Sequence, residues 1–219
     1  MLQLEPISDL AHQYFQAKNV AREESLALAR EAIRSSANAI RAVHRQDFAR
    51  AQQLLAAAGD ALKRAVGVLA AHPDVLYAGY VQDAQKEYAE AMATQAIVRR
   101  EPLPGPDDLG VSWPAYLNGL GEAVGEVRRY ILDQLRHSAA EQCEDLLQAM
   151  DDVYDLLVTI DYPDAMTGGL RRTTDMVRGV LERTRGDLTM AQRQQELERR
   201  LGEVELRLAE PTPGAAERS

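Results

Sequence analysis

Apolar side chains recur three and four residues apart along almost the whole chain. This spacing predicts amphipathic α-helices, because residues that far apart lie on one face of a helix. No segment shows the alternation of apolar and polar residues that is typical of a half-buried strand. Aromatic residues make up only 5% of the chain, while alanine, leucine, glutamate and arginine are abundant, which also favours helix over sheet. The predicted fold is therefore all-α.

The predicted helices are long. They cover about residues 7–44, 47–71, 73–99, 113–137 and 170–208, with a further helix around residues 146–157. We expect the first to be broken near Asn19 and the last to fray near Gly186. The proline-rich residues 101–114 and the pair Gly168-Gly169 mark loops. The sequence thus predicts a bundle of six to seven long helices. It forms a single domain over residues 1–210, followed by a disordered tail over residues 211–219.

Composition excludes several classes of protein. A net charge of -9 and a pI near 5.0 argue against non-specific nucleic-acid binding, although 25 lysines and arginines allow local basic surface. The single cysteine, Cys143, rules out an internal disulfide and a Cys-based zinc site. The N-terminus does not resemble a signal peptide, and no apolar run is long enough for a membrane span, so we expect a cytoplasmic protein. Known nucleotide-binding loops and zinc-protease motifs are absent.

Two segments place paired carboxylates on one face of an apolar helix. Glu87 and Glu90 are three residues apart, and Glu122 and Glu126 are four apart, so each pair projects from one side. Like charges at this spacing repel each other. Where the two pairs converge, a hard divalent cation such as Mg²⁺ would relieve the repulsion, because it prefers oxygen ligands. Such an ion also activates water and offsets charge on a phosphate, so the pattern indicates a metal-dependent enzyme acting on phosphate esters.

Exposed glutamates are common on helices, so two solvated acidic stripes are the main alternative interpretation. Three features argue against it. Apolar residues flank both pairs, and glycines at 119, 121 and 125 lie inside the second helix. A glycine inside a helix costs up to about 1 kcal/mol relative to alanine, and it is useful where another backbone or a substrate must come close. In addition, Lys86, Arg128 and Arg129 lie within a turn of the carboxylates and could neutralise a substrate phosphate near the metal.

At these residues the chain resembles the translin family, and in particular its catalytic branch, translin-associated factor X. The family's Glu-Tyr-x-Glu-Ala segment matches residues 87–91. Its second motif, Asp-Tyr-Leu-x-Gly-x-x-Asp-x-x-Gly-Glu-x-x-Arg, matches residues 115–129. The similarity extends from about Arg22 to Leu188. One departure from the family motif matters: Glu122 stands where the family has aspartate and reaches one methylene further.

The resemblance implies a function and an assembly. Two glutamates of the first motif and one acidic residue of the second are metal ligands in that branch, which gives this role to Glu87, Glu90 and Glu122. Glu126 matches a further acidic position and would be a fourth ligand or a partner of the ligands. The expected protein is a Mg²⁺- or Mn²⁺-dependent endoribonuclease with a seven-helix fold. It would cleave single-stranded RNA inside a closed homo-oligomer, typically an octamer.

Basic residues of the first long helix are candidates for contacts to the nucleic-acid backbone. They are Arg30, Arg34, Arg41, His44 and Arg45, to which Lys86 and Arg129 are added beside the acidic pairs. For His44, a solvated helix end is an equally good interpretation. Two other functions stay open: a non-catalytic, translin-like scaffold that binds single-stranded DNA or RNA, and a helical protein–protein scaffold whose acidic faces meet only water.

Overall fold

The computed structural model describes residues 4–136 and 143–209, and its regular secondary structure there is all helical. Six long helices form the body. They are α1 (Glu5–His44), α2 (Phe48–Val68), α4 (Tyr80–Arg99), α6 (Trp113–Leu135), α7 (Glu144–Val158) and α9 (Leu170–Ala209). Three single-turn helices, α3 (Pro73–Leu76), α5 (Pro106–Leu109) and α8 (Asp164–Thr167), lie in the connections. The all-α bundle predicted from the sequence is confirmed. The predicted end of the fourth helix at residue 137 and the predicted tail at 211–219 lie outside the described residues.

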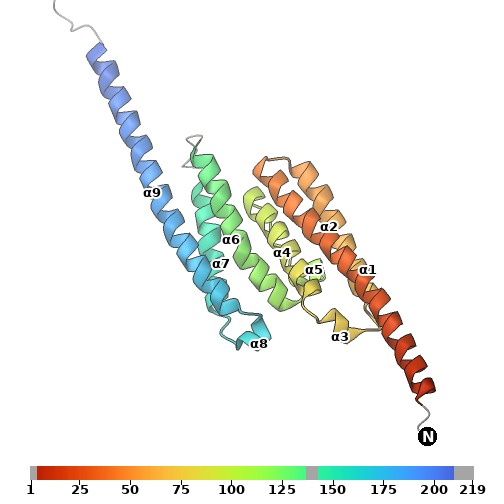
Figure 1. Cartoon of the computed structure of the whole chain (residues 1–219). Coiled ribbons are helices and arrows are strands. Elements are labelled where there is room, and N and C mark those ends of the chain that lie inside the picture. Colours follow the sequence, from red (N-terminus) through yellow and green to blue (C-terminus); the bar gives the residue numbers. More distant parts are fainter. Residues whose placement is uncertain (1–3, 137–142, 210–219) are drawn as a thin grey trace, which may run out of the picture.

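The long helices pack side by side, and α4 lies near the middle (Figure 1). It contacts α1, α2 and α6, while α6 also packs against α7 and α9. The N-terminal part of α1 and the C-terminal part of α9 project beyond the bundle at opposite ends (Figure 1). No helix in the described ranges is long and apolar enough to cross a membrane.

The central position of α4 explains the unusual surroundings of its polar residues. Small apolar residues of this helix, such as Ala84, Ala89 and Ala91, are at most 1% exposed. Because neighbours cover the helix on several sides, polar residues between these alanines are only partly exposed. The main apolar core that results includes residues of α1, α2, α4, α6, α7 and α9, and smaller apolar clusters lie beside it.

The predicted helix over residues 73–99 is wrong in one respect, since it is two helices. Gly79 has φ +104°, a conformation that L side chains rarely adopt, and it separates α3 from α4. The Gln82 side chain then accepts a hydrogen bond from the Gly79 backbone N–H and donates one to the Leu76 carbonyl. These bonds fix the start of α4 and thereby the register of the residues that follow.

The break expected near Asn19 and the fraying expected near Gly186 are also absent. Helix α1 continues through Asn19, and α9 continues through Gly186. Asparagine and glycine lower helix propensity by only about 0.7 to 1 kcal/mol. Each residue lies within a helix of 40 residues, whose other hydrogen bonds and packing outweigh a penalty of that size.

Candidate functional site

Three glutamates from two helices converge between α4 and α6. Glu87 and Glu90 belong to α4, and Glu122 belongs to α6. Each offers a carboxylate oxygen, and the three oxygens all lie within 4.8 Å of one another. We call these three residues the glutamate triad. Carboxylates 32 to 35 positions apart in the chain are thus brought within the reach of one small ion.

A glycine makes this convergence sterically allowed. A Cβ atom at Gly119 would lie 2.5 Å from the Lys86 carbonyl oxygen and 2.9 Å from the Glu90 backbone nitrogen. Only a residue without a side chain lets the α6 backbone come this close to α4. Gly119 stands one turn before Glu122, so the close approach of the two backbones is what places Glu122 against the α4 glutamates.

The triad concentrates negative charge in a partly buried place. Burial, together with the nearby carboxylates of Glu87, Glu122 and Glu126, raises the pKa of Glu90 to about 8. Burial also raises the pKa of Glu87, an effect that Lys86 partly offsets. The free energy of ionising the whole group is therefore unfavourable unless a positive charge is supplied.

Lys86 supplies one such charge. Its Nζ donates a hydrogen bond of 2.7 Å to Glu122 Oε1. Burial disfavours the charged ammonium, but the hydrogen bond to Glu122 and the other carboxylates outweigh this, so the pKa of Lys86 is raised. Among the described residues, one ammonium group thus faces three carboxyl groups. The excess of negative charge and the all-oxygen donor set fit a hard divalent ion, and the triad could hold one.

Glu126 lies outside the triad and pairs with α1 instead. Its Oε2 is 2.5 Å from Nε2 of His44, whose side chain is only 7% exposed. The hydrogen bond from His44 holds the pKa of Glu126 below its usual range, against the effect of burial. Arg129 adds a longer contact of 3.8 Å. Glu126 thus joins α6 to α1, and it acts on the triad only through the repulsion it exerts on Glu90.

This pairing changes the expectation for His44. The imidazole is buried against Glu126 and is not part of the exposed basic surface. By contrast, the four arginines proposed from the same helix are all exposed. Their spacing of four, seven and four residues keeps them on one side of α1. These are Arg30, Arg34, Arg41 and Arg45, which we call the α1 arginine stripe.

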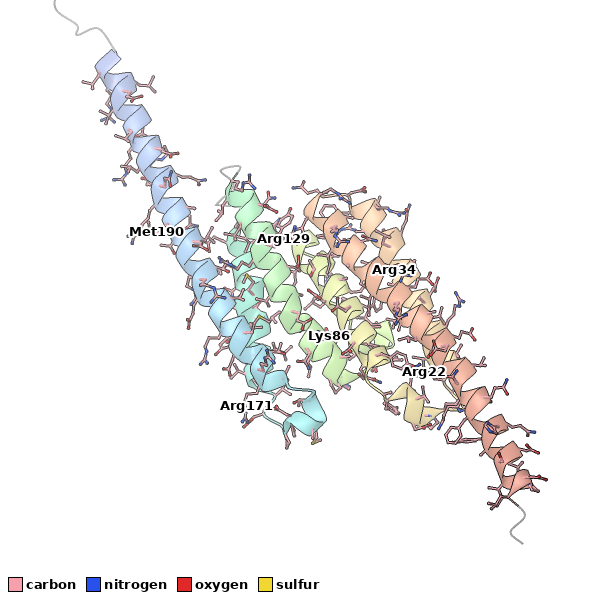
Figure 2. All side chains as sticks on the ribbon, in the orientation of Figure 1. Arg22, Arg34, Lys86, Arg129, Arg171 and Met190 are labelled. Carbon is pink, nitrogen blue, oxygen red and sulfur yellow. The ribbon has the colours of Figure 1, made fainter. Side chains whose placement is uncertain are left out.

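Candidate phosphate contacts occur on three neighbouring helices. Figure 2 shows Arg34 on α1, Lys86 on α4 and Arg129 on α6. Arg129 is 61% exposed at its side chain, whereas Lys86 is engaged with Glu122.

Arg172 at the start of α9 was not singled out from the sequence. The only signal for it was the Gly168-Gly169 pair just before it, which we interpreted as a loop.

The chain has relatives among known proteins. It is 31% identical over 177 residues to the uncharacterised protein MJ0175 of Methanocaldococcus jannaschii, a match that covers 80% of this chain and 78% of the relative. No family model matches the sequence.

Three solved structures share its fold. The crystal structure of AfC3PO is 32% identical, with a TM-score of 0.77, and the match covers 84% of this chain and 96% of AfC3PO. AfC3PO in complex with duplex RNA gives 32% identity and a TM-score of 0.78, covering 84% and 95% of the two chains. Apo-NeC3PO, at 21% identity and a TM-score of 0.76, covers 87% and 98% and supports the fold alone. The resemblance seen in the two sequence motifs is thereby confirmed, and the chain belongs to the C3PO proteins of the translin family.

Proposed function

We propose that this protein is a divalent-cation-dependent endoribonuclease that cleaves single-stranded RNA at the glutamate triad. The observation that carries the proposal is the convergence of three carboxylate oxygens within 4.8 Å, with the Lys86 ammonium as the counter-charge that the described part of the chain provides. A purely structural cluster would be expected to carry balanced charge or to lie in open solvent. Here burial and the neighbouring carboxylates keep the pKa of Glu90 far above its ordinary value.

Each residue has a distinct part in this proposal. Glu87, Glu90 and Glu122 would hold Mg²⁺ or Mn²⁺, and the bound ion would activate water and offset the charge of the scissile phosphate. The Lys86 ammonium lies at the edge of the triad, where it can turn from Glu122 toward a phosphate. Glu126, held by His44, fixes α6 against α1 and adds negative potential near Glu90. The α1 arginine stripe would bind the RNA backbone electrostatically.

The proposal extends to the substrate and the assembly. AfC3PO has been crystallised with duplex RNA, which supports RNA as the ligand class here. We propose single-stranded RNA as the cleaved form, and a homo-oligomer, an octamer as is typical of the family, as the active species. A mass measurement by light scattering tests the assembly. Parallel assays with single-stranded RNA, single-stranded DNA and duplex RNA test the substrate.

The decisive assay measures cleavage and binding on the same variants. Labelled single-stranded RNA is incubated with the wild-type protein in Mg²⁺ or Mn²⁺, with and without EDTA. The test variant is Glu90→Gln, which keeps the shape of the side chain but removes its charge. The matched control is Glu31→Gln, an exposed glutamate on α1. Binding is measured separately in EDTA, where no cleavage is expected.

We expect cleavage that EDTA abolishes and that Glu90→Gln lowers by at least a hundredfold, while Glu31→Gln behaves as the wild type. RNA binding should be retained in both variants. RNA binding without any metal-dependent cleavage would contradict the enzyme and support the non-catalytic scaffold for single-stranded nucleic acid. Absence of RNA binding even at low salt, where phosphate contacts are strongest, would leave the protein–protein scaffold.

A further inference from the structure

A cleft of about 540 Å³ opens beside the glutamate triad, between α4, α6 and the start of α9. Lys86 and Glu122 form part of its wall, so the cleft and the triad are continuous. On the opposite side the wall is made by Gly169, Arg172 and Met176. The volume falls in the range of about 300 to 1,000 Å³ that is usual for small-molecule sites. The cleft is therefore large enough for one nucleotide.

Arg172 is a free cation in this wall. Within residues 4–136 and 143–209, its guanidinium has no ion pair or hydrogen bond. The adjacent Arg171 behaves differently, because its Nη2 is 3.0 Å from Asp161 Oδ1. Further along α9, Arg178 and Arg185 are paired with Asp175 and Asp151. Arg172 thus presents an uncompensated guanidinium, the group best suited to bind phosphate oxygens.

The wall that carries Arg172 is held firmly against α6. The Asn118 side chain donates hydrogen bonds of 2.8 Å to the Pro114 and Thr167 carbonyls, and it accepts one of 2.6 Å from the Thr173 hydroxyl. Asn118 is itself only 7% exposed. Gly121 allows the contact, since a Cβ there would lie 2.4 Å from Thr173 Cγ2. Arg172, next to Thr173, therefore projects from a rigid support, which reduces the entropy lost on binding.

The rest of the wall fits a nucleotide better than a bare anion. Pro114 and Met176 provide apolar surface on which a base or sugar can pack. The side chains of Asn118 and Gln82 in the same wall are hydrogen-bonded within the protein, so they shape the cleft. Asp83 is the carboxylate of the wall that lies outside the triad, and it is exposed to solvent. Its charge is therefore screened, but it still favours a phosphate position nearer to Arg172 than to α4.

We propose that this cleft binds the RNA nucleotide next to the scissile phosphate, with Arg172 contacting the phosphate of that nucleotide. The inference deepens the proposed function and rests on it, because the cleft would hold the strand in register with the triad. Arg172 is a binding residue here and takes no part in the bond-breaking step. Its loss should therefore weaken RNA binding and raise KM with little change in kcat.

The test compares Arg172→Ala with Arg171→Ala, the paired arginine one position earlier. Binding of a fluorescent twelve-nucleotide single-stranded RNA is measured in EDTA at several salt concentrations. We expect about tenfold weaker binding for Arg172→Ala, the loss of one charge-assisted phosphate contact. The slope of log affinity against log salt should fall in magnitude by about 0.7. Arg171→Ala should bind as the wild type, and Arg172→Lys should recover part of the affinity.

The outcomes separate this inference from the proposed function. Equal affinity and equal salt slope for the two alanine variants would overturn the nucleotide cleft, whatever the cleavage assay shows. If the wild type fails to cleave RNA but Arg172→Ala still weakens binding selectively, the cleft stands as an RNA-binding site and the catalytic proposal fails. A fall in kcat with unchanged KM would also contradict the inference, because it would assign Arg172 to the reaction itself.

Discussion

Replacement of Glu90 by glutamine should stabilise the protein in the absence of divalent ions. Burial and three neighbouring carboxylates raise the pKa of Glu90 to about 8, from an ordinary value of 4.5. At pH 7 the folded protein therefore keeps a proton on Glu90 that the unfolded chain has released. For each pH unit above the ordinary pKa, up to the pKa of the folded state, keeping this proton lowers the free energy of unfolding by about 1.4 kcal/mol. The penalty at pH 7 is thus up to about 3 kcal/mol.

The sign of the pH dependence follows from the same shift. Because the pKa of Glu90 is higher in the folded state, the folded protein binds more protons than the unfolded chain between about pH 4.5 and 8. Stability should therefore fall as the pH rises through this window. Glutamine has no proton to lose, so the difference in stability between Glu90→Gln and the wild type should grow from near zero at pH 4 to about 1–3 kcal/mol at pH 7.5.

The assay is urea denaturation in EDTA at a fixed protein concentration, followed by circular dichroism at pH 4, 5.5 and 7.5. Glu31→Gln on the exposed face of α1 is the control, and it should match the wild type at every pH. Addition of Mn²⁺ should reverse the order by stabilising the wild type but not Glu90→Gln. If Glu90→Gln is no more stable than the wild type at pH 7.5, the carboxylates do not repel each other as described.

Other substitutions test the packing that positions the triad. Gly119→Ala should lower the unfolding free energy by about 1–3 kcal/mol, because its Cβ would collide with the α4 backbone. Gly125→Ala, at a partly exposed position of the same helix where an added Cβ meets nothing within 4 Å, should be neutral or stabilising by up to about 1 kcal/mol; equal effects of the two in thermal denaturation would refute the close contact. His44→Ala should cost about 1–3 kcal/mol at pH 7 by leaving Glu126 without its partner. Since the pKa of Glu126 is lowered in the folded state, that cost should shrink as the pH falls below 4.5, and a cost independent of pH would count against the pair. Asp47→Ala should remove the side-chain cap on the Arg50 N–H at the start of α2 and cost about 1 kcal/mol in urea denaturation.

The spacing of apolar residues along the sequence predicted much of the fold. The helical periodicity defined the six long helices to within a few residues at most ends. It missed Gly79, because a single glycine in a helical pattern carries no sign of its φ angle. It also treated Asn19 and Gly186 as stronger breakers than they are. Propensity is a small energy for each residue, and a long packed helix outweighs it.

The candidate site could be predicted only where a short stretch of chain determines it. The spacing of Glu87 and Glu90 places them on one face of α4. A glycine inside a helix, Gly119, indicated that another backbone or a substrate comes close. The partner of Glu126 could not be predicted in this way, because His44 lies 82 residues earlier and the contact depends on how α1 and α6 each pack against α4. Arg172 was missed for the same reason, since its role depends on the cleft beside α6.

Direct localisation of a metal ion tests the central claim most sharply. Crystals of the wild-type protein and of Glu90→Gln would be soaked in Mn²⁺, and anomalous diffraction would locate the ions. The account predicts a strong peak in the wild type that is coordinated by oxygens of Glu87, Glu90 and Glu122, and its loss in the variant. A metal centre at this place would be contradicted if the three carboxylates are well ordered and no peak appears at saturating Mn²⁺. It would also be contradicted if Lys86 is still bound to Glu122 beside the carboxylates under these conditions.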